Sequence, residues 1–185
     1  MKGVATALPG VIVVEPDVHG DARGFFLETW SERRWREAGV DARIVQTNHS
    51  LSGARIVRGL HAQLSPMAQG KLVRAVEGAI FDVAVDLRRG SPTFGRFAAV
   101  ELSASNFRQM WVPPGFAHGF AVLGECAQVE YACTEYYAPE HEIAIAWNDP
   151  AIGIPWPFSD PVLSKRDAEA PPLARWEGRL PEFRP

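Results

Sequence analysis

The sequence predicts an all-β fold, built as a sandwich or a barrel. Short apolar stretches recur along most of the chain, and glycine or proline separates one stretch from the next. Several stretches alternate between apolar and polar residues, which is typical of a strand with one buried face. One segment near the N-terminus has the spacing and end signals of a longer helix, so helices contribute little to the expected architecture.

The N-terminal part is predicted to contain two strands and this helix. Residues 9–14 and 25–29 are apolar enough for strands, and the polar residues 17–23 between them are predicted to form a loop. A serine can cap a helix over residues 31–38, and Gly39 follows at the position where glycine commonly ends a helix.

The centre of the chain carries the clearest strand pattern. Residues 80–87 alternate, which places Asp82, Ala84 and Asp86 on one face and apolar side chains on the other. The Ser-Leu-Ser-Gly sequence at residues 50–53 is predicted to be a turn. The other strands are predicted at residues 44–49, 56–63, 71–77, 97–102, 109–112, 119–123, 128–136 and 143–147.

We expect a single domain over residues 1–185. From about residue 150 the proline content rises, which indicates an irregular C-terminal tail with one helical turn at residues 163–168.

Composition limits the classes of partner. The chain has 19 basic and 22 acidic residues, a net charge of −3, which argues against nucleic acid or an anionic membrane surface as the main partner. No apolar run approaches the roughly 20 residues of a membrane span, and the N-terminus lacks the pattern of a secretory signal. Cys126 and Cys133 fit neither a disulfide framework nor a zinc motif, so we expect free thiols in a cytoplasmic protein.

Residues 57–71 concentrate chemically active side chains. A neutral imidazole, His61, near a fixed cation such as Lys71 can act as a base toward a carbon acid. Alternatively, His61 is a half-buried strand histidine and the cations are solvated. Arg58 has the opposite strand parity to His61, so the two enter one cavity only if a bulge intervenes. Otherwise Arg58 lies at a rim, at a subunit boundary or in a surface salt bridge.

A second dense stretch covers residues 111–120. Its Pro113, Gly115 and His118 resemble the second motif of cupins, in which this histidine binds a metal. The matching first motif reads His-Ala-Gln at residues 61–63, and Lys71 lies near the place of the acidic ligand. Because an ammonium repels a divalent cation, we expect a pocket without metal. The alternative for His118 is a hydrogen-bonded core histidine.

Two further residues fit acid–base chemistry. Tyr131, which shares a strand face with Val129, can serve as a general acid, although strand tyrosines usually pack with a polar tip. Asp167 can hold the His61 imidazole in one tautomer, or it can cap a C-terminal turn. The candidates for anion binding are Arg23, Arg58, Lys71, Arg166 and His118.

A series of motifs extends over almost the whole chain. They include DARGFF at 21–26, QTNHS at 46–50, RGLH at 58–61, QGKLV at 69–73, SPTFG at 91–95, PGFAHGF at 114–120, YAPEHE at 137–142, WNDP at 147–150 and LSKRD at 163–167. In this order, the motifs resemble those of the dTDP-4-dehydrorhamnose 3,5-epimerase family.

The resemblance implies a metal-free cupin jelly roll that works as a homodimer without a cofactor. The implied substrate is dTDP-4-dehydro-6-deoxy-D-glucose, whose C3 and C5 are inverted beside the C4 ketone. His61 would be the base, Asp167 would orient it, Lys71 would stabilise the enolate and Tyr131 would return the proton. The implied contacts to nucleotide or sugar come from Arg23, Glu28, Gln46, Asn48, Arg58, Lys71, His118, Tyr137, Glu142 and Arg166.

The chain departs from the family pattern at three places. Ala62 stands where an aromatic residue is common, Arg166 stands where a lysine is common, and residues 143–146 are less polar than usual. The sequence therefore leaves open a mono-epimerase or ketoisomerase that acts on a dTDP-4-keto-6-deoxy sugar. A cupin that binds a small ligand is the alternative from another functional class.

Overall fold

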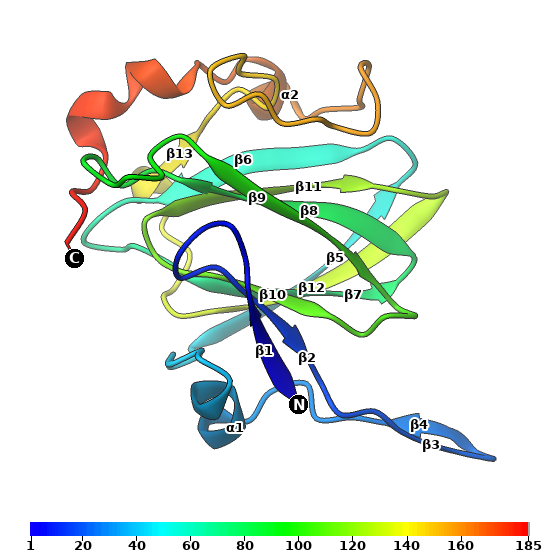
Figure 1. Cartoon of the computed structure of the whole chain (residues 1–185). Helices are drawn as coiled ribbons and strands as arrows, with labels where there is room; N and C mark the ends of the chain where they lie inside the picture. The colour runs from blue at the N-terminus through cyan, green and yellow to red at the C-terminus, as the bar shows by residue number, and fades with distance from the viewer. Residues whose placement is uncertain (185) are drawn as a thin grey trace.

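The protein is a two-layer β sandwich in the computed structural model, which describes residues 1–184 (Figure 1). The larger sheet has the order β1-β2-β10-β7-β12-β5, and the smaller sheet has the order β13-β6-β11-β8-β9. All the pairs within the two sheets are antiparallel. The larger sheet contains β1 (Lys2–Ala5), β2 (Ile12–Glu15), β10 (Gln109–Val112), β7 (Lys71–Glu77), β12 (Cys126–Cys133) and β5 (Gln46–Gly53). The smaller sheet contains β13 (Glu142–Ala144), β6 (Val57–Gln63), β11 (Phe116–Val122), β8 (Ala79–Asp86) and β9 (Phe97–Ser103).

Successive strands from β5 to β8, and again from β9 to β13, alternate between the two sheets, as in a jelly roll. The predicted all-β class is therefore confirmed. Among residues 1–184, no helix combines the length and apolar character that crossing a bilayer requires.

Strand parity places one face of each sheet in the core between the layers. Val73 and Ala75 of β7 pack there with Val129 of β12, as the alternation predicts. From the smaller sheet, β8 contributes Ile80 and Ala84 to the same core. The interior is therefore apolar along most of its length, and polar groups that enter it need partners.

The opposite face of β8 is also buried, because the C-terminal segment covers the smaller sheet (Figure 1). Val83 and Val85 pack there with Leu173, and the Trp156 ring lies 5.9 Å from the Phe81 ring. The regular elements of this segment are the helices α2 (Lys165–Ala168), η2 (Leu173–Arg175) and η3 (Glu177–Arg179). A further helical turn, η1 (Pro139–His141), precedes β13.

An N-terminal arm extends from the sandwich at the lower right of Figure 1. It is the hairpin of β3 (His19–Asp21) and β4 (Gly24–Phe26), which exposes Phe25 and Phe26. Helix α1 (Glu32–Glu37) follows and buries Trp35 completely. Gly39 has a φ of +96°, as expected for a residue that ends a helix.

Several predicted boundaries are wrong. The predicted strand at residues 9–14 begins only at Ile12, and β1 was not predicted because this edge strand lacks a buried face. Residues 50–53 belong to β5, and the turn comes after Gly53. Three residues of the predicted loop at residues 17–23 form β3 and pair with β4. The sequence of β3 has little apolar character, so the pattern did not indicate a strand there.

The remaining strands are shifted or shortened at their ends. The predicted strand at residues 25–29 is limited to the hairpin strand β4. Strand β11 begins at Phe116 rather than residue 119, β12 ends at Cys133 rather than residue 136, and β13 stops at Ala144. These changes move the ends of the strands and leave their order along the chain intact.

Candidate active site

A cavity of about 610 Å³ opens between the two sheets and is closed on one side by the C-terminal segment. Of the predicted site residues, it brings together Gln46, Asn48, Arg58, His61, Lys71, His118, Tyr131, Tyr137, Glu142, Arg166 and Asp167. They come from six strands, the loop before β13 and helix α2. The structure therefore joins side chains that are separated by more than one hundred residues in the chain.

His61 and Asp167 form a direct pair in this cavity. The Nε2 atom of His61 lies 2.5 Å from Oδ1 of Asp167, whose side chain is 3% exposed. Burial acts to raise the pKa of Asp167, but hydrogen bonds from His61, from Ser164 and from the backbone of Gly59 hold this pKa below its ordinary value. Asp167 is thus a carboxylate that fixes one ring nitrogen of His61. Ser164 accepts the hydrogen bond at the start of α2, so the capping role falls to Ser164.

Lys71 and Tyr131 lie on the larger sheet, which faces the sheet of His61. The Nζ atom of Lys71 is 5.9 Å from the centre of the Tyr131 ring. Burial lowers the pKa of Lys71, against the charges of Cys133, Glu142 and Asp82, and burial also raises the pKa of Tyr131. The Lys71 amine and a protonated Tyr131 phenol therefore face the imidazole across one cavity.

His118 lies directly opposite His61 in the pairing of β11 with β6. Its Nε2 atom is 2.7 Å from Oδ1 of Asp82, and its side chain is 8% exposed. His118 therefore combines both predicted alternatives, since it is a hydrogen-bonded buried histidine whose ring also lines the cavity. No cluster of three or more His, Cys, Asp or Glu side chains suited to a metal occurs within residues 1–184.

A bulge brings Arg58 and His61 into the same cavity despite their opposite parity. Against β11, His61 pairs with His118 and Arg58 pairs with Phe120, so two residues of β6 oppose Gly119 alone. Arg58 donates to Ser52 Oγ at 2.8 Å and to the Leu51 carbonyl at 3.1 Å. It forms no ion pair within the described chain, so the surface salt bridge alternative is wrong.

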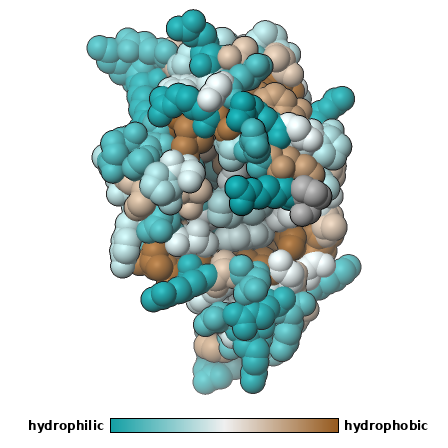
Figure 2. Space-filling model, turned by 90° about the vertical axis from the view of Figure 1, so that its left-hand side faces the viewer, coloured by the Kyte–Doolittle hydropathy of each residue, from teal (hydrophilic) through white to brown (hydrophobic). Residues whose placement is uncertain are grey.

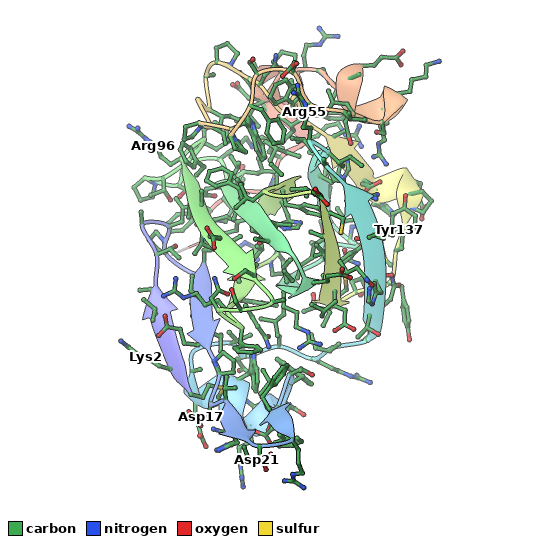
Figure 3. The ribbon with its side chains drawn as sticks, turned by 90° about the vertical axis from the view of Figure 1, so that its right-hand side faces the viewer. Lys2, Asp17, Asp21, Arg55, Arg96 and Tyr137 are labelled. Atoms are coloured by element: carbon green, nitrogen blue, oxygen red, sulfur yellow. The ribbon has the colours of Figure 1, made fainter. Side chains whose placement is uncertain are left out.

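A polar network surrounds the mouth of the cavity. Tyr137 donates through its hydroxyl to Glu142 at 3.1 Å, and Arg166 forms an ion pair with the same carboxylate. The backbone N–H of Tyr137 donates to Gln46, whose amide in turn donates to Asn48 at 2.9 Å. This network holds the half-exposed Tyr137 ring at the rim, and Figure 3 shows Tyr137 at the side of the sandwich.

Two predicted site residues lie outside this cavity. Arg23 is 90% exposed and pairs with Asp21, which Figure 3 shows at the lower end of the molecule, away from Tyr137. Glu28 pairs with Arg34 of α1. Seen from the left-hand side of Figure 1, hydrophilic residues gather on the lower part of the molecule (Figure 2). Within residues 1–184, Arg23 and Glu28 form no hydrogen bond or ion pair with the residues that line the cavity, and their predicted role stays a prediction.

Sequence reasoning missed several residues that line the cavity. They are Ser50, Ile56, Val57, Gln69, Phe120, Val162, Leu163 and Ser164. It also missed the contact of Asp82 with His118. A buried partner for Asp82 could have been predicted from the sequence, because an acid within an apolar, alternating strand requires one.

Comparisons with known proteins agree on one family. The family model described as dTDP-4-dehydrorhamnose 3,5-epimerase matches residues 5–175. A curated enzyme of that name from Pseudomonas aeruginosa is 54% identical over 176 residues, which cover 94% of this chain and 97% of that protein.

Solved structures give the same result. A dTDP-6-deoxy-D-glucose-3,5-epimerase from Legionella pneumophila, solved with dTDP-4-keto-L-rhamnose, has a TM-score of 0.95 and 45% identity, and the match covers 100% of this chain and 99% of that chain. A 3'-monoepimerase from Streptomyces bikiniensis, solved with dTDP-quinovose, has a TM-score of 0.90 and 36% identity, and the match covers 98% of this chain and 93% of that chain.

Proposed function

This chain belongs to the dTDP-4-dehydrorhamnose 3,5-epimerase family, and we infer that it inverts C3 and C5 of dTDP-4-dehydro-6-deoxy-D-glucose in dTDP-L-rhamnose biosynthesis. It is an isomerase that acts on a nucleotide-linked sugar. The observation that supports the chemistry best is the His61–Asp167 pair, which faces Lys71 and Tyr131 across a cavity of about 610 Å³.

The first chemical step is removal of a proton from a carbon beside the C4 ketone. We assign this step to His61, because Asp167 fixes Nε2 and leaves Nδ1 as the ring nitrogen that can accept the proton. The low exposure of Asp167 keeps water from competing for this hydrogen bond. The carboxylate also stabilises the imidazolium that forms.

Removal of this proton leaves negative charge on the C4 oxygen, which a base alone does not stabilise. We assign this stabilisation to Lys71, which lines the cavity and forms no ion pair within residues 1–184, so its amine is free to meet the oxygen. Lys71 lines the cavity between the sheets, where a bound substrate excludes water and leaves its charge less screened than at the surface.

Inversion requires that the proton return to the opposite face of the carbon. Tyr131 is the assigned acid, because it lies on β12 of the larger sheet, whereas His61 lies on β6 of the smaller sheet. Burial keeps the phenol protonated by raising its pKa. Applied first at one carbon and then at the other, the same pair of groups accounts for both inversions.

We assign the nucleotide to the mouth of the cavity. Arg58 and Arg166 can bind the diphosphate as forked donors, and the exposed ring of Tyr137 offers a stacking surface for the base. Gln46, Asn48 and Glu142 supply amide and carboxylate groups beside that ring.

We also propose that the protein works as a homodimer. The arm exposes Phe25 at 63% and Phe26 at 68%, and such apolar side chains are typical of a contact surface. Docking of this arm onto a second copy would carry Arg23 and Glu28 toward that copy's cavity, as the family resemblance implies.

The experiment is turnover of dTDP-4-dehydro-6-deoxy-D-glucose in deuterated water, with reduction of the product and analysis by NMR. The expected result is deuterium at both C3 and C5, together with inverted configuration at both carbons. Label at one carbon only would establish a mono-epimerase, the activity of the Streptomyces bikiniensis neighbour. No label at either carbon would refute an epimerase and favour a ligand-binding cupin.

A further inference from the structure

The WNDP motif at residues 147–150 contains a buried carboxylate that the proposed chemistry does not use. This carboxylate, Asp149, lies in the turns that follow β13 and is 4% exposed. Within residues 1–184, Asp149 forms no ion pair, and it does not line the cavity. A buried carboxylate is costly unless hydrogen bonds satisfy it, so the contacts of Asp149 should explain its position.

Asp149 accepts two backbone hydrogen bonds that join distant parts of the C-terminal segment. Its Oδ1 atom accepts from the N–H of Ala151 at 2.9 Å, which closes a local turn. Its Oδ2 atom accepts from the N–H of Leu173 at 2.7 Å, across 24 positions of the chain. Hydrogen bonds from N–H groups to a carboxylate are among the stronger ones in proteins. Asp149 therefore ties the start of the segment to the first residue of η2.

A short and stiff stretch of chain connects Leu173 to Asp167. Pro171 and Pro172 stand directly before Leu173, and their rings fix their φ angles. The carbonyl of Pro171 also accepts a hydrogen bond from the N–H of Ala146 at 2.9 Å. Leu173 itself is 5% exposed and packs on the smaller sheet. A shift of Leu173 would therefore be passed on toward α2, because the chain between them has little freedom to absorb it.

The chain on the other side of α2 is held to β6. The N–H of Val162 donates to the carbonyl of Arg55 at 2.9 Å, and the N–H of Val57 donates to the carbonyl of Val162 at 3.2 Å. These two bonds form the parallel bridge between Ile56 and Val162. In Figure 1, α2 lies above β6, which it contacts. Asp167 thus lies between two fixed points of the chain, and its distance from the imidazole depends on both.

We propose that Asp149 is a positioning residue of this active site, which holds Leu173 in place and so keeps Asp167 against His61. The two carboxylates act in series, since Asp149 fixes the segment and Asp167 fixes the imidazole. A displacement of about 1 Å at a catalytic group can lower turnover about 100-fold. The effect on turnover rests on the proposed function, whereas the effect on the segment can be measured without substrate.

The test is a double-mutant cycle of Asp149→Ala and Asp167→Ala, in which kcat is measured for both single variants and for the double variant. We expect Asp149→Ala to lower kcat about 100-fold when Asp167 is present. When Asp167 is already removed, the same change should lower kcat less than about threefold, because the group that it positions is absent. A purely structural role would lower kcat by the same factor in both backgrounds, and that result would overturn the proposal.

Asp86→Asn is the matched control for this cycle. Asp86 is also a buried carboxylate that accepts a backbone hydrogen bond, from the N–H of Arg88 at 2.9 Å, but it holds the loop after β8. This variant should therefore keep the wild-type kcat at a temperature at which both proteins are folded. A fall of kcat in Asp86→Asn as large as in Asp149→Ala would mean that the loss of any buried carboxylate lowers turnover, which would also overturn the proposal.

Hydrogen–deuterium exchange provides a measurement that needs no substrate. In Asp149→Ala, the backbone amides of residues 163–173 should exchange at least about tenfold faster, with β7 and β12 at the wild-type rate. Unchanged exchange in this segment would refute the positioning role. Should Asp149→Ala fail to fold, Asp149→Asn, which keeps one acceptor oxygen, replaces it in both measurements. A wild-type protein that is inactive on the dTDP sugar would refute the proposed function, yet the exchange result would still decide the role of Asp149.

Discussion

Asp86 provides a stability prediction whose size follows from its contacts. This carboxylate at the end of β8 is 0% exposed and accepts hydrogen bonds from Arg88, Ser91 and Thr93. These bonds overcome the effect of burial and lower the pKa of Asp86 from 3.8 to about 2. At about 1.4 kcal/mol per pKa unit, the ionised form contributes roughly 2.5 kcal/mol to the free energy of unfolding.

The sign of the pH dependence follows from the direction of this shift. Because the pKa is lower in the folded protein, the contribution of Asp86 is fully present above pH 3.8 and is lost as the pH falls toward 2. Asp86→Asn should therefore lower stability near neutral pH by about 2.5 kcal/mol, which corresponds to a Tm decrease of roughly 5–10 °C. The difference between the two proteins should shrink below about pH 4.

The assay is thermal or urea unfolding of wild type and Asp86→Asn at several pH values. Asp21→Asn is the control, because Asp21 also pairs with an arginine but is exposed on the arm, so its unfolding midpoint should stay at the wild-type value. A destabilisation of the same size at neutral and acidic pH would refute the electrostatic reasoning. It would instead indicate that Asp86 acts by packing and shape.

Three further predictions concern the cavity. His61→Ala should fold as wild type and lose turnover by at least about 1,000-fold, measured as product formation, and retained activity would remove His61 from the mechanism. Tyr131→Phe should still exchange substrate protons with deuterated water while inverted product falls about 100-fold; loss of both together would contradict an acid role. Gly59→Ala should lower stability by roughly 1–3 kcal/mol, because its Cβ would lie 2.7 Å from Gly119 Cα at a φ of +112°. A Gly59→Ala protein with wild-type melting and kcat would show that the bulge does not require glycine at this position.

Strand parity predicted the inner wall of the site because it depends only on alternation. Lys71 with Val73, and Tyr131 with Val129, lie on the faces that the sequence assigns to them. These strands are regular over the relevant residues, so a period of two residues is sufficient. Where a strand is regular and half-buried, the alternation of its residues is enough to predict which side chains face the interior.

The position of Arg58 could not be predicted in this way. The bulge opposite Gly119 changes the parity of β6 between Arg58 and His61, and it depends on a close approach of two strands that are distant in sequence. The contact of Asp82 with His118 has the same origin, since it joins β8 to β11. Such contacts depend on tertiary register, which a single strand does not encode.

The jelly roll explains why this cavity suits inversion at carbon. Inversion needs a base and an acid on opposite faces of one flat intermediate, and two facing sheets supply side chains from opposite directions. Here β6 supplies His61 from the smaller sheet, whereas β7 and β12 supply Lys71 and Tyr131 from the larger sheet. The apolar interior between the sheets strengthens the charges that these groups present. The proposed base and acid are therefore separated by the architecture itself, so the C-terminal segment needs only to place Asp167 against His61.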